Sequence, residues 1–308
     1  MTADLSYAEA VIVGLFQGVT ELFPVSSLGH SVLIPALVGG RWAQDLNVST
    51  PESPYLAFIV GLHVATAIAL LLFFWRDWLV IIGGFFSSLR HRRITTRPER
   101  LAWLIVLATI PVGLSGLALE HLFRTTLGKP IPAAAFLVVN GAILLLGERQ
   151  RRAAPVPANA LSANASGTDD RSTLGNAVDD RLADQTVKQG VLIGCAQILA
   201  LLPGISRSGI TMVAGLLRGL SHEEAARFSF LLATPIILAA GLFKVPDLFG
   251  PLGDGIHGQV LAGGIASFIA AYLSVRFLTK YFETRTLTPF AIYCLALGGI
   301  GLLWLTLR

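Results

Sequence analysis

Charged side chains are scarce in this sequence of 308 residues. Asp, Glu, Lys and Arg make up 14% of it, whereas 54% of the residues are hydrophobic. A soluble domain carries about 25% charged residues to cover its water-facing surface, so this composition excludes an ordinary soluble protein. The mean hydropathy of +0.68 points the same way. The sequence therefore predicts an integral membrane protein.

Cysteine is also rare. Cys195 and Cys294 both lie in apolar runs, and two thiols cannot build a disulfide-dense scaffold or a four-thiolate metal site. We interpret them as small core side chains. The net charge of +4 indicates cationic cytoplasmic loops in a membrane protein, and we expect no nucleic-acid partner. The oligomeric state is left open by the sequence.

Six apolar segments have the length of about 17–25 residues that is needed to cross a hydrocarbon core of about 30 Å. They are 55–74, 101–119, 131–147, 228–243, 259–278 and 289–307. The apolar stretch 79–89 is too short to cross, so it is predicted to extend the first span or to lie at the interface. The sequence thus predicts an all-α polytopic membrane protein with six transmembrane helices.

Two further apolar regions, 5–39 and 187–220, are interrupted by polar residues and prolines. A helix over 208–217 would rise only about 15 Å at 1.5 Å per residue, which is half of the membrane. Each region is therefore predicted to be a re-entrant helix pair. Three crossing helices follow each pair and reverse the orientation of the next unit, so we expect an inverted repeat with its site between the broken helices.

The predicted halves, 1–147 and 187–308, are joined by a segment at 148–186 that is rich in Ala, Asn, Ser and Asp. This segment has no periodic apolar face, so we expect a flexible linker without a site. Most of the 23 Lys and Arg residues fall on the linker's side of the predicted spans. The positive-inside rule then places the linker in the cytoplasm and both chain ends outside.

The first interrupted region places polar side chains at membrane depth, where an ionisable residue is by default a functional-site hypothesis. Gln17 and Glu21 are four residues apart, hence on one helical face. After Pro24, either Ser26 or Ser27 is suited to cap the next helix. His30 lies four residues after Ser26 and three after Ser27, hence on the same helical face as both. Serines after a proline are equally often mere caps.

The second region repeats the arrangement with Ser206, Arg207 and Ser208 at a helix start and Thr211 one turn later. Hydroxyls, backbone N–H groups and the positive end of a helix at one point are typical of phosphate sites. The planar guanidinium of Arg207 is suited to two phosphate oxygens. A purely structural pairing of Glu21 with Arg207 is the alternative.

Two other groups of residues have purely structural interpretations. His63 lies in the first span with no charged neighbour in sequence, so we interpret it as a buried neutral histidine. The run Ser221 to Glu224 fits a capping box for the helix that follows and needs no further function.

The motifs QGVTELFPVSSLGH at 17–30 and PGISRSGIT at 203–211 resemble the two signature motifs of the bacterial undecaprenyl-diphosphatases, also called bacitracin-resistance proteins. The resemblance extends to FSFLLA at 228–233 and PFAIY at 289–293, and leaves out only the linker. It implies an enzyme of the bacterial cytoplasmic membrane that hydrolyses undecaprenyl diphosphate to undecaprenyl phosphate and inorganic phosphate. Its partners would be that substrate and membrane lipid, and its role the recycling of the carrier for cell-wall synthesis.

The resemblance also implies roles for residues. Glu21, His30, Ser27 and Arg207 would be catalytic, and the substrate would contact Gln17 and the hydroxyls of Ser26, Ser206, Ser208 and Thr211. A divalent cation, Mg²⁺ or Ca²⁺, is implied, with Glu21 as its ligand. Some members have two carboxylates in the first motif, but Gln17 replaces one of them here, which weakens such a metal site.

Two chemistries fit these residues: attack by Ser27 with His30 as its base, or activation of water by His30 and Glu21. The alternative function is a transporter or flippase of a polyprenyl phosphate or another anionic lipid, because inverted repeats with broken helices are common in transporters. Glu21 favours an enzyme, since a carboxylate beside an anion site weakens binding unless it handles protons or metal. The polar segment 39–53 follows the first pair, so we expect the site to open to the external side.

Overall fold

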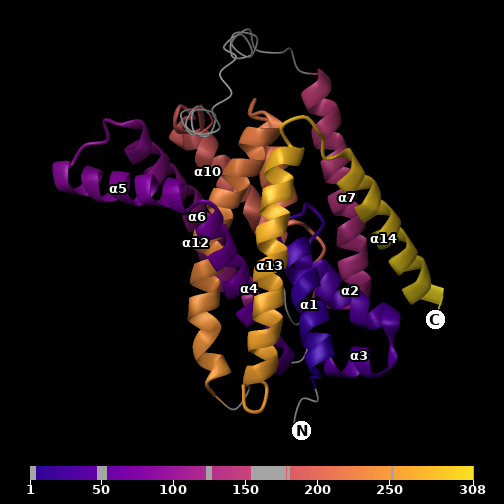
Figure 1. The fold of residues 1–308 in the computed structure, drawn as a ribbon. Coiled ribbons are helices and arrows are strands. Elements are labelled where there is room, and N and C mark those ends of the chain that lie inside the picture. The colour runs from indigo at the N-terminus through magenta and orange to yellow at the C-terminus, as the bar shows by residue number, and fades with distance from the viewer. Residues whose placement is uncertain are drawn as a thin grey trace.

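The structure is a computed structural model that describes residues 5–46, 54–122, 127–153, 178, 181–250 and 253–307. Every regular element in these residues is helical (Figure 1). Five helices are long and apolar enough to cross a membrane: α6 (Arg97–Leu122), α7 (Pro130–Ala153), α12 (His222–Leu248), α13 (His257–Tyr281) and α14 (Thr288–Leu307). The chain is therefore a multi-pass membrane protein.

The first predicted span, 55–74, corresponds to α4 (Pro54–Phe73), and the helix after it changes direction. The segment Trp75–His91, which is α5, is bent by 86° from Phe58–Phe73, and Figure 1 shows it projecting sideways from the bundle. Leu79, Ile82 and Phe86 on one face of α5 are exposed, which is typical of a helix lying in the membrane interface. The interfacial alternative for 79–89 is therefore the one that the structure supports.

The linker predicted at 148–186 is wrong at both of its described ends. Helix α7 continues to Ala153, and Val178 and Leu182 are buried. Arg181 also forms an ion pair of 2.7 Å with Glu224 on α12. These residues are ordered because they pack against the crossing helices. Composition alone does not reveal this stabilisation by packing. Residues 154–177 and 179–180 lie outside the described residues.

The two interrupted regions form two broken helix pairs. The first consists of α1 (Tyr7–Thr20) and α2 (Ser27–Val38), followed by the short α3 (Gly40–Asp45). The second consists of α10 (Val187–Ala196), the 3₁₀ helix η3 (Gln197–Leu201) and α11 (Arg207–Leu216). In Figure 1, α1 starts near the N-terminus at the lower face and α10 lies near the upper face. The pairs thus start from opposite faces, as an inverted repeat requires.

Matching residues of the two pairs are separated by a constant number of positions. Ser6 and Thr186 begin α1 and α10, each with a complete capping box. Ser26 and Ser206 begin α2 and α11, and each accepts a hydrogen bond of 3.2 Å from the backbone N–H three residues later. This shared local chemistry supports the predicted repeat, while the exact boundaries of its halves stay a prediction.

Small residues let each pair approach the crossing helix of the opposite half. A Cβ at Gly14 would collide with the backbone carbonyl of Gly263 on α13, and a Cβ at Gly194 would collide with that of Ala108 on α6. Close backbone approach through small residues is the usual way in which helices associate in lipid, where no hydrophobic force drives them together. The packing brings the two broken loops together in the interior.

Candidate active site

The loop between α1 and α2 contacts the loop between η3 and α11. The hydroxyls of Ser206 and Ser208 both donate to the carbonyl oxygen of Phe23 in the first loop, at 3.4 and 3.1 Å. A Cβ at Gly29 would lie 3.0 Å from Gly204 in the second loop. The residues of the two sequence motifs, which lie far apart in the chain, therefore share one location.

Asn140 on α7 connects these loops and was missed by the sequence analysis. Its carboxamide nitrogen donates to the carbonyl oxygen of Pro24 at 3.1 Å, and its oxygen accepts from the backbone N–H of Ser206 at 2.9 Å. The side chain is buried, with 1% of its surface exposed. A polar residue within a predicted span was the available signal.

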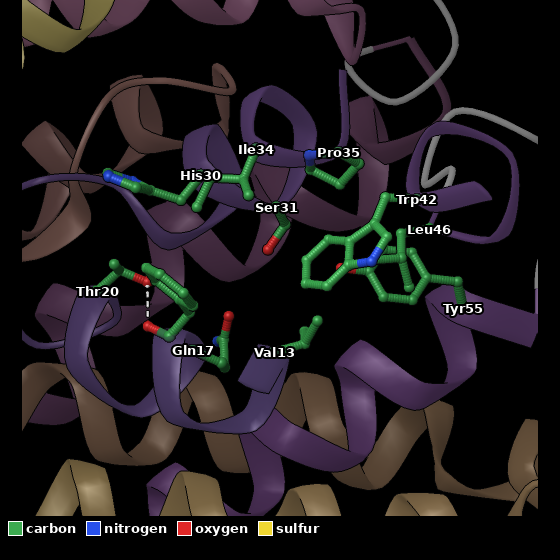
Figure 2. Close-up of a pocket in the computed structure, with 11 residues that line it drawn as sticks. Val13, Gln17, Thr20, His30, Ser31, Ile34, Pro35, Trp42, Leu46 and Tyr55 are labelled. Atoms are coloured by element: carbon green, nitrogen blue, oxygen red, sulfur yellow. Dashed lines mark hydrogen bonds between the residues drawn. The ribbon is translucent and has the colours of Figure 1, made fainter. Parts of the chain in front are cut away.

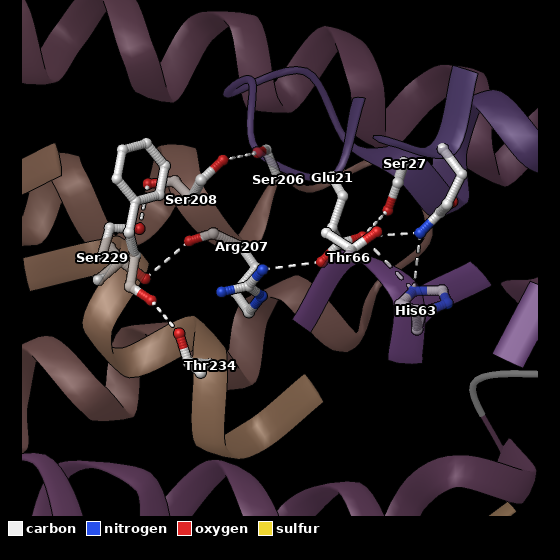
Figure 3. A network of polar contacts seen from close by, with 12 residues as sticks. Glu21, Ser27, His63, Thr66, Ser206, Arg207, Ser208, Ser229 and Thr234 are labelled. Carbon is white, nitrogen blue, oxygen red and sulfur yellow. Dashed lines mark hydrogen bonds and ion pairs between the residues drawn. The ribbon is translucent and has the colours of Figure 1, made fainter. Parts of the chain in front are cut away.

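Glu21 is the centre of the polar network in Figure 3. Its Oε1 accepts a hydrogen bond of 2.7 Å from Nη2 of Arg207, so the two motifs are joined by an ion pair. Its Oε2 accepts from the hydroxyl of Ser27 at 2.5 Å and from the amide of Gln17 at 3.2 Å. The predicted residues Glu21, Ser27, Arg207 and Gln17 are therefore brought together.

Arg207 is the first residue of α11 and retains an unused donor. Its Nη2 is occupied by Glu21, but its Nη1 is buried and has no hydrogen-bond partner. The side chain is 14% exposed. Because an unsatisfied buried donor is costly, Nη1 is suited to an incoming anionic oxygen at the N-terminal end of the helix.

His63 contacts the same carboxylate, so its interpretation as a buried histidine apart from the site is wrong. Its Nε2 lies 3.4 Å from Oε2 of Glu21 and 3.1 Å from the amide nitrogen of Gln17. The side chain is 29% exposed rather than fully buried. The carboxylate comes from a segment some 40 residues away in the chain, which is why the local sequence gave no sign of it.

His30 has other partners than the sequence predicts. Its Nδ1 is 2.7 Å from the carbonyl oxygen of Ser26, and its Nε2 is 2.7 Å from the hydroxyl of Tyr293 on α14. The two rings are also stacked. Both ring nitrogens are thus engaged away from Ser27, so the structure lacks the pairing that would make His30 the base for this serine.

The remaining predicted hydroxyls hold the backbone in place. Ser26 and Ser206 cap their helices, and Thr211 donates to the carbonyl oxygen of Arg207 at 2.7 Å. Ser26 also has a φ of +69°, a left-handed conformation that is strained for a residue with a Cβ and that clusters at functional sites. Direct contact of these hydroxyls with a phosphate stays a prediction.

A small cavity lies beside Gln17 (Figure 2). Its wall includes Thr20, Trp42 of α3 and Tyr55 of α4. His30 also borders the cavity, but its imidazole points away from Trp42 and Tyr55 in Figure 2. The cavity thus lies next to Gln17 and has polar as well as apolar residues in its wall.

The donors of the site do not fit a resident divalent cation. Mg²⁺ and Ca²⁺ prefer six or more oxygen ligands, yet no group of three or more His, Cys, Asp or Glu residues with metal-site geometry occurs among the described residues. Both oxygens of Glu21 already accept hydrogen bonds, from Arg207 on one side and Ser27 and Gln17 on the other. The implied Mg²⁺ or Ca²⁺ therefore stays a prediction that these residues alone do not support.

Known proteins with similar sequences identify the family of this chain. The chain is 72% identical to proteins named undecaprenyl-diphosphatase from Mycolicibacterium paratuberculosis and Mycobacterium avium, over 100% of both chains in each case. It is 52% identical to undecaprenyl-diphosphatase 1 of Frankia casuarinae, over 97% of this chain and 98% of that protein. The model of the bacitracin resistance protein BacA family matches residues 10–300. This chain therefore belongs to the bacitracin resistance protein BacA family.

Proposed function

We propose that this chain hydrolyses undecaprenyl diphosphate to undecaprenyl phosphate and inorganic phosphate. This reaction recycles the lipid carrier of cell-wall synthesis and underlies bacitracin resistance. Membership of the family supports the activity, and one observation in the site carries it. The buried Nη1 of Arg207 has no partner, and it lies on the guanidinium that binds Glu21, the carboxylate contacted by Ser27.

The terminal phosphate of the substrate would bind to the unused donor of Arg207 and to the N-terminal ends of α2 and α11. Phosphoryl transfer demands mainly positioning and electrostatic stabilisation, which these groups supply. Ser27 then attacks the terminal phosphorus, its proton passes to Glu21, and the bridging P–O bond breaks to release undecaprenyl phosphate. Water hydrolyses the phosphoserine to inorganic phosphate and restores Ser27.

The hydrogen bond from Ser27 to Glu21 supports this serine route over direct attack by water. An acid-quenched single turnover tests it. The serine route predicts that undecaprenyl phosphate forms before inorganic phosphate, that the peptide containing residues 17–30 gains a phosphoryl group, and that Ser27→Ala is inactive. Simultaneous formation of both products by an active Ser27→Ala variant would establish attack by water instead.

Phosphate release by purified protein in detergent tests the activity itself. A micelle has no second compartment, so release of inorganic phosphate reports hydrolysis and not transport. We expect release by the wild type and a loss of nearly all of it in Arg207→Ala and in Glu21→Ala. A wild type that releases no phosphate even with Mg²⁺ or Ca²⁺ present would favour the transporter or flippase, which the inverted repeat also fits.

The site is proposed to serve the external or periplasmic side of the membrane. The cavity beside Gln17 is bordered by α3 and by the start of α4, on the face that the positive-inside rule places outside. In a variant without Cys195 and Cys294, we expect Ala43→Cys on α3 to react with an impermeant thiol reagent in intact spheroplasts. Thr284→Cys, in the connection between α13 and α14, should react only after lysis. The opposite pattern would reverse the orientation.

A further inference from the structure

One face of α14 lies against the loop between α1 and α2. This face presents Phe290, Tyr293 and Cys294, which are three or four residues apart and therefore neighbours on the helix surface. The ring of Phe290 lies edge to face with that of Phe23, with 5.5 Å between their centroids. The thiol of Cys294 is 3.8 Å from the carbonyl oxygen of Pro24. Helix α14 thus contacts the first half of the loop.

Tyr293 reaches the other half of this loop through His30. Its hydroxyl is 2.7 Å from Nε2 of His30, whose Nδ1 is 2.7 Å from the carbonyl oxygen of Ser26. We propose that Tyr293 is a positioning residue. It fixes His30, and His30 fixes the backbone turn at Ser26 that presents Ser27 to the phosphate. This inference rests on the proposed phosphatase activity and adds a residue that neither signature motif contains.

The groups that form these two hydrogen bonds determine their directions. A carbonyl oxygen only accepts, so Nδ1 of His30 carries the hydrogen and donates to Ser26. In the neutral ring, Nε2 then has the lone pair and accepts from the hydroxyl of Tyr293. The two rings are also parallel within 1°, with 5.7 Å between their centroids. Both nitrogens of His30 are therefore used in holding the turn.

The backbone at Ser26 has to be held by its surroundings. Its φ of +69° is a strained conformation that persists only where neighbouring groups fix it. The backbone N–H of Gly29 donates to the hydroxyl of Ser26 at 3.2 Å, and the imidazole of His30 holds the carbonyl oxygen. Ser27 follows directly and donates to Glu21 at 2.5 Å. A turn that relaxed would displace the hydroxyl of Ser27 from this carboxylate.

The variant Tyr293→Phe keeps the stacked ring and removes only the hydroxyl. We expect kcat of phosphate release to fall by about 10-fold, which is less than the cost of about 100-fold for a displacement of 1 Å. KM should stay within about twofold because Arg207 is untouched. The matched control is Tyr281→Phe, since the hydroxyl of Tyr281 donates to the carbonyl of Thr286 at 3.4 Å, in the connection between α13 and α14. This control should keep wild-type kcat, and equal kcat values for the two variants would refute the role of Tyr293.

The variant His30→Asn separates positioning from proton transfer. Its amide can still donate to the carbonyl of Ser26, but it accepts no proton and is too short for Tyr293. We expect kcat to stay within about 10-fold of the wild type, whereas His30→Ala should lose about 100-fold. Adding Tyr293→Phe to His30→Asn should lower kcat by less than about twofold, because Tyr293 acts only through His30. An Asn variant as inactive as the Ala variant, or a full additional loss in the double variant, would overturn the proposal.

Nitrogen-15 NMR of protein labelled in its imidazole rings tests the same hydrogen bonds without relying on activity. The chain has six histidines, and the signals of His30 are those that His30→Asn lacks. We expect a neutral ring with its hydrogen on Nδ1, and a shift of the Nε2 signal in Tyr293→Phe. A hydrogen on Nε2 or an unchanged Nε2 signal would contradict the positioning role. A wild type that shows the expected signals but releases no phosphate would instead refute the proposed function.

Discussion

Removal of the Asn140 side chain should both destabilise the fold and misplace the site. In Asn140→Ala the backbone N–H of Ser206 loses its acceptor at 2.9 Å, and the carbonyl of Pro24 loses its donor at 3.1 Å. The thiol of Cys294, 3.8 Å from that carbonyl, is only a weak donor. Each buried group left without a partner costs about 1–3 kcal/mol, and the weak donor Cys294 offsets part of the second cost, so we expect a loss of about 2–4 kcal/mol.

The activity of Asn140→Ala should fall by more than a loss of folded protein explains. Asn140 ties the loop that leads to Ser27 to the loop that leads to Arg207, and a displacement of about 1 Å between catalytic groups costs about 100-fold in rate. Phosphate release, measured well below the melting temperature so that the variant stays folded, should therefore drop by roughly that factor. Melting in detergent should show a decrease of roughly 5–10 °C.

Thr234→Val provides the matched control for a buried polar group. The hydroxyl of Thr234 on α12 donates to the carbonyl of Phe230 in its own helix at 2.9 Å, so its removal should leave the loops in place. We expect this variant to melt within about 3 °C of the wild type and to retain its activity. If Asn140→Ala matched Thr234→Val in both measurements, the argument that Asn140 aligns the loops would be refuted.

Three further predictions concern the site and the packing. Arg207→Lys retains the charge but loses the planar donor pair, so kcat/KM for phosphate release should fall by about 100-fold; wild-type kinetics would contradict a role for Nη1. Protein without substrate should bind no Mn²⁺ stoichiometrically in electron paramagnetic resonance titrations, since Glu21 is already occupied; one tight site that Glu21→Gln abolishes would overturn this. Gly194→Ala should lower the melting temperature, because its Cβ would meet the backbone of Ala108. Gly299→Ala, whose Cβ would meet nothing within 4 Å, should leave that temperature unchanged or raise it, and equal effects would refute the close contact.

Features that depend on neighbouring residues in the chain were predictable. Among the described residues, five helices that can cross occur where apolar length placed them, and α4 occupies the remaining predicted segment, because spanning a hydrocarbon core is a property of a continuous segment. The capping box at Ser221 is present, with hydrogen bonds of 2.7 and 3.1 Å to and from Glu224. The breaks in the two re-entrant pairs were likewise visible, because proline and capping serines act within a few residues of their own position.

The local sequence could not show which partner each polar side chain has. His63 was assigned from its own helix, yet tertiary packing places it beside Glu21 and Gln17 of the first motif. One of the two predicted chemistries has His30 act on Ser27, three residues away, but the packing of α14 supplies Tyr293 instead. The local sequence therefore wrongly excluded His63 from the site, and it suggested a serine partner for His30 that is absent.

Composition and contacts within a few residues are enough to predict the membrane environment of the chain, its crossing helices and the two broken loops. Contacts between distant segments fix the remaining features: α5 turns by 86°, Asn140 ties the loops together, and Glu21 pairs with Arg207 while contacting His63. Such side chains satisfy their buried hydrogen bonds and charges with partners from other helices, which no local pattern reveals. Which helices lie adjacent depends on close packing at small residues such as Gly14 and Gly194.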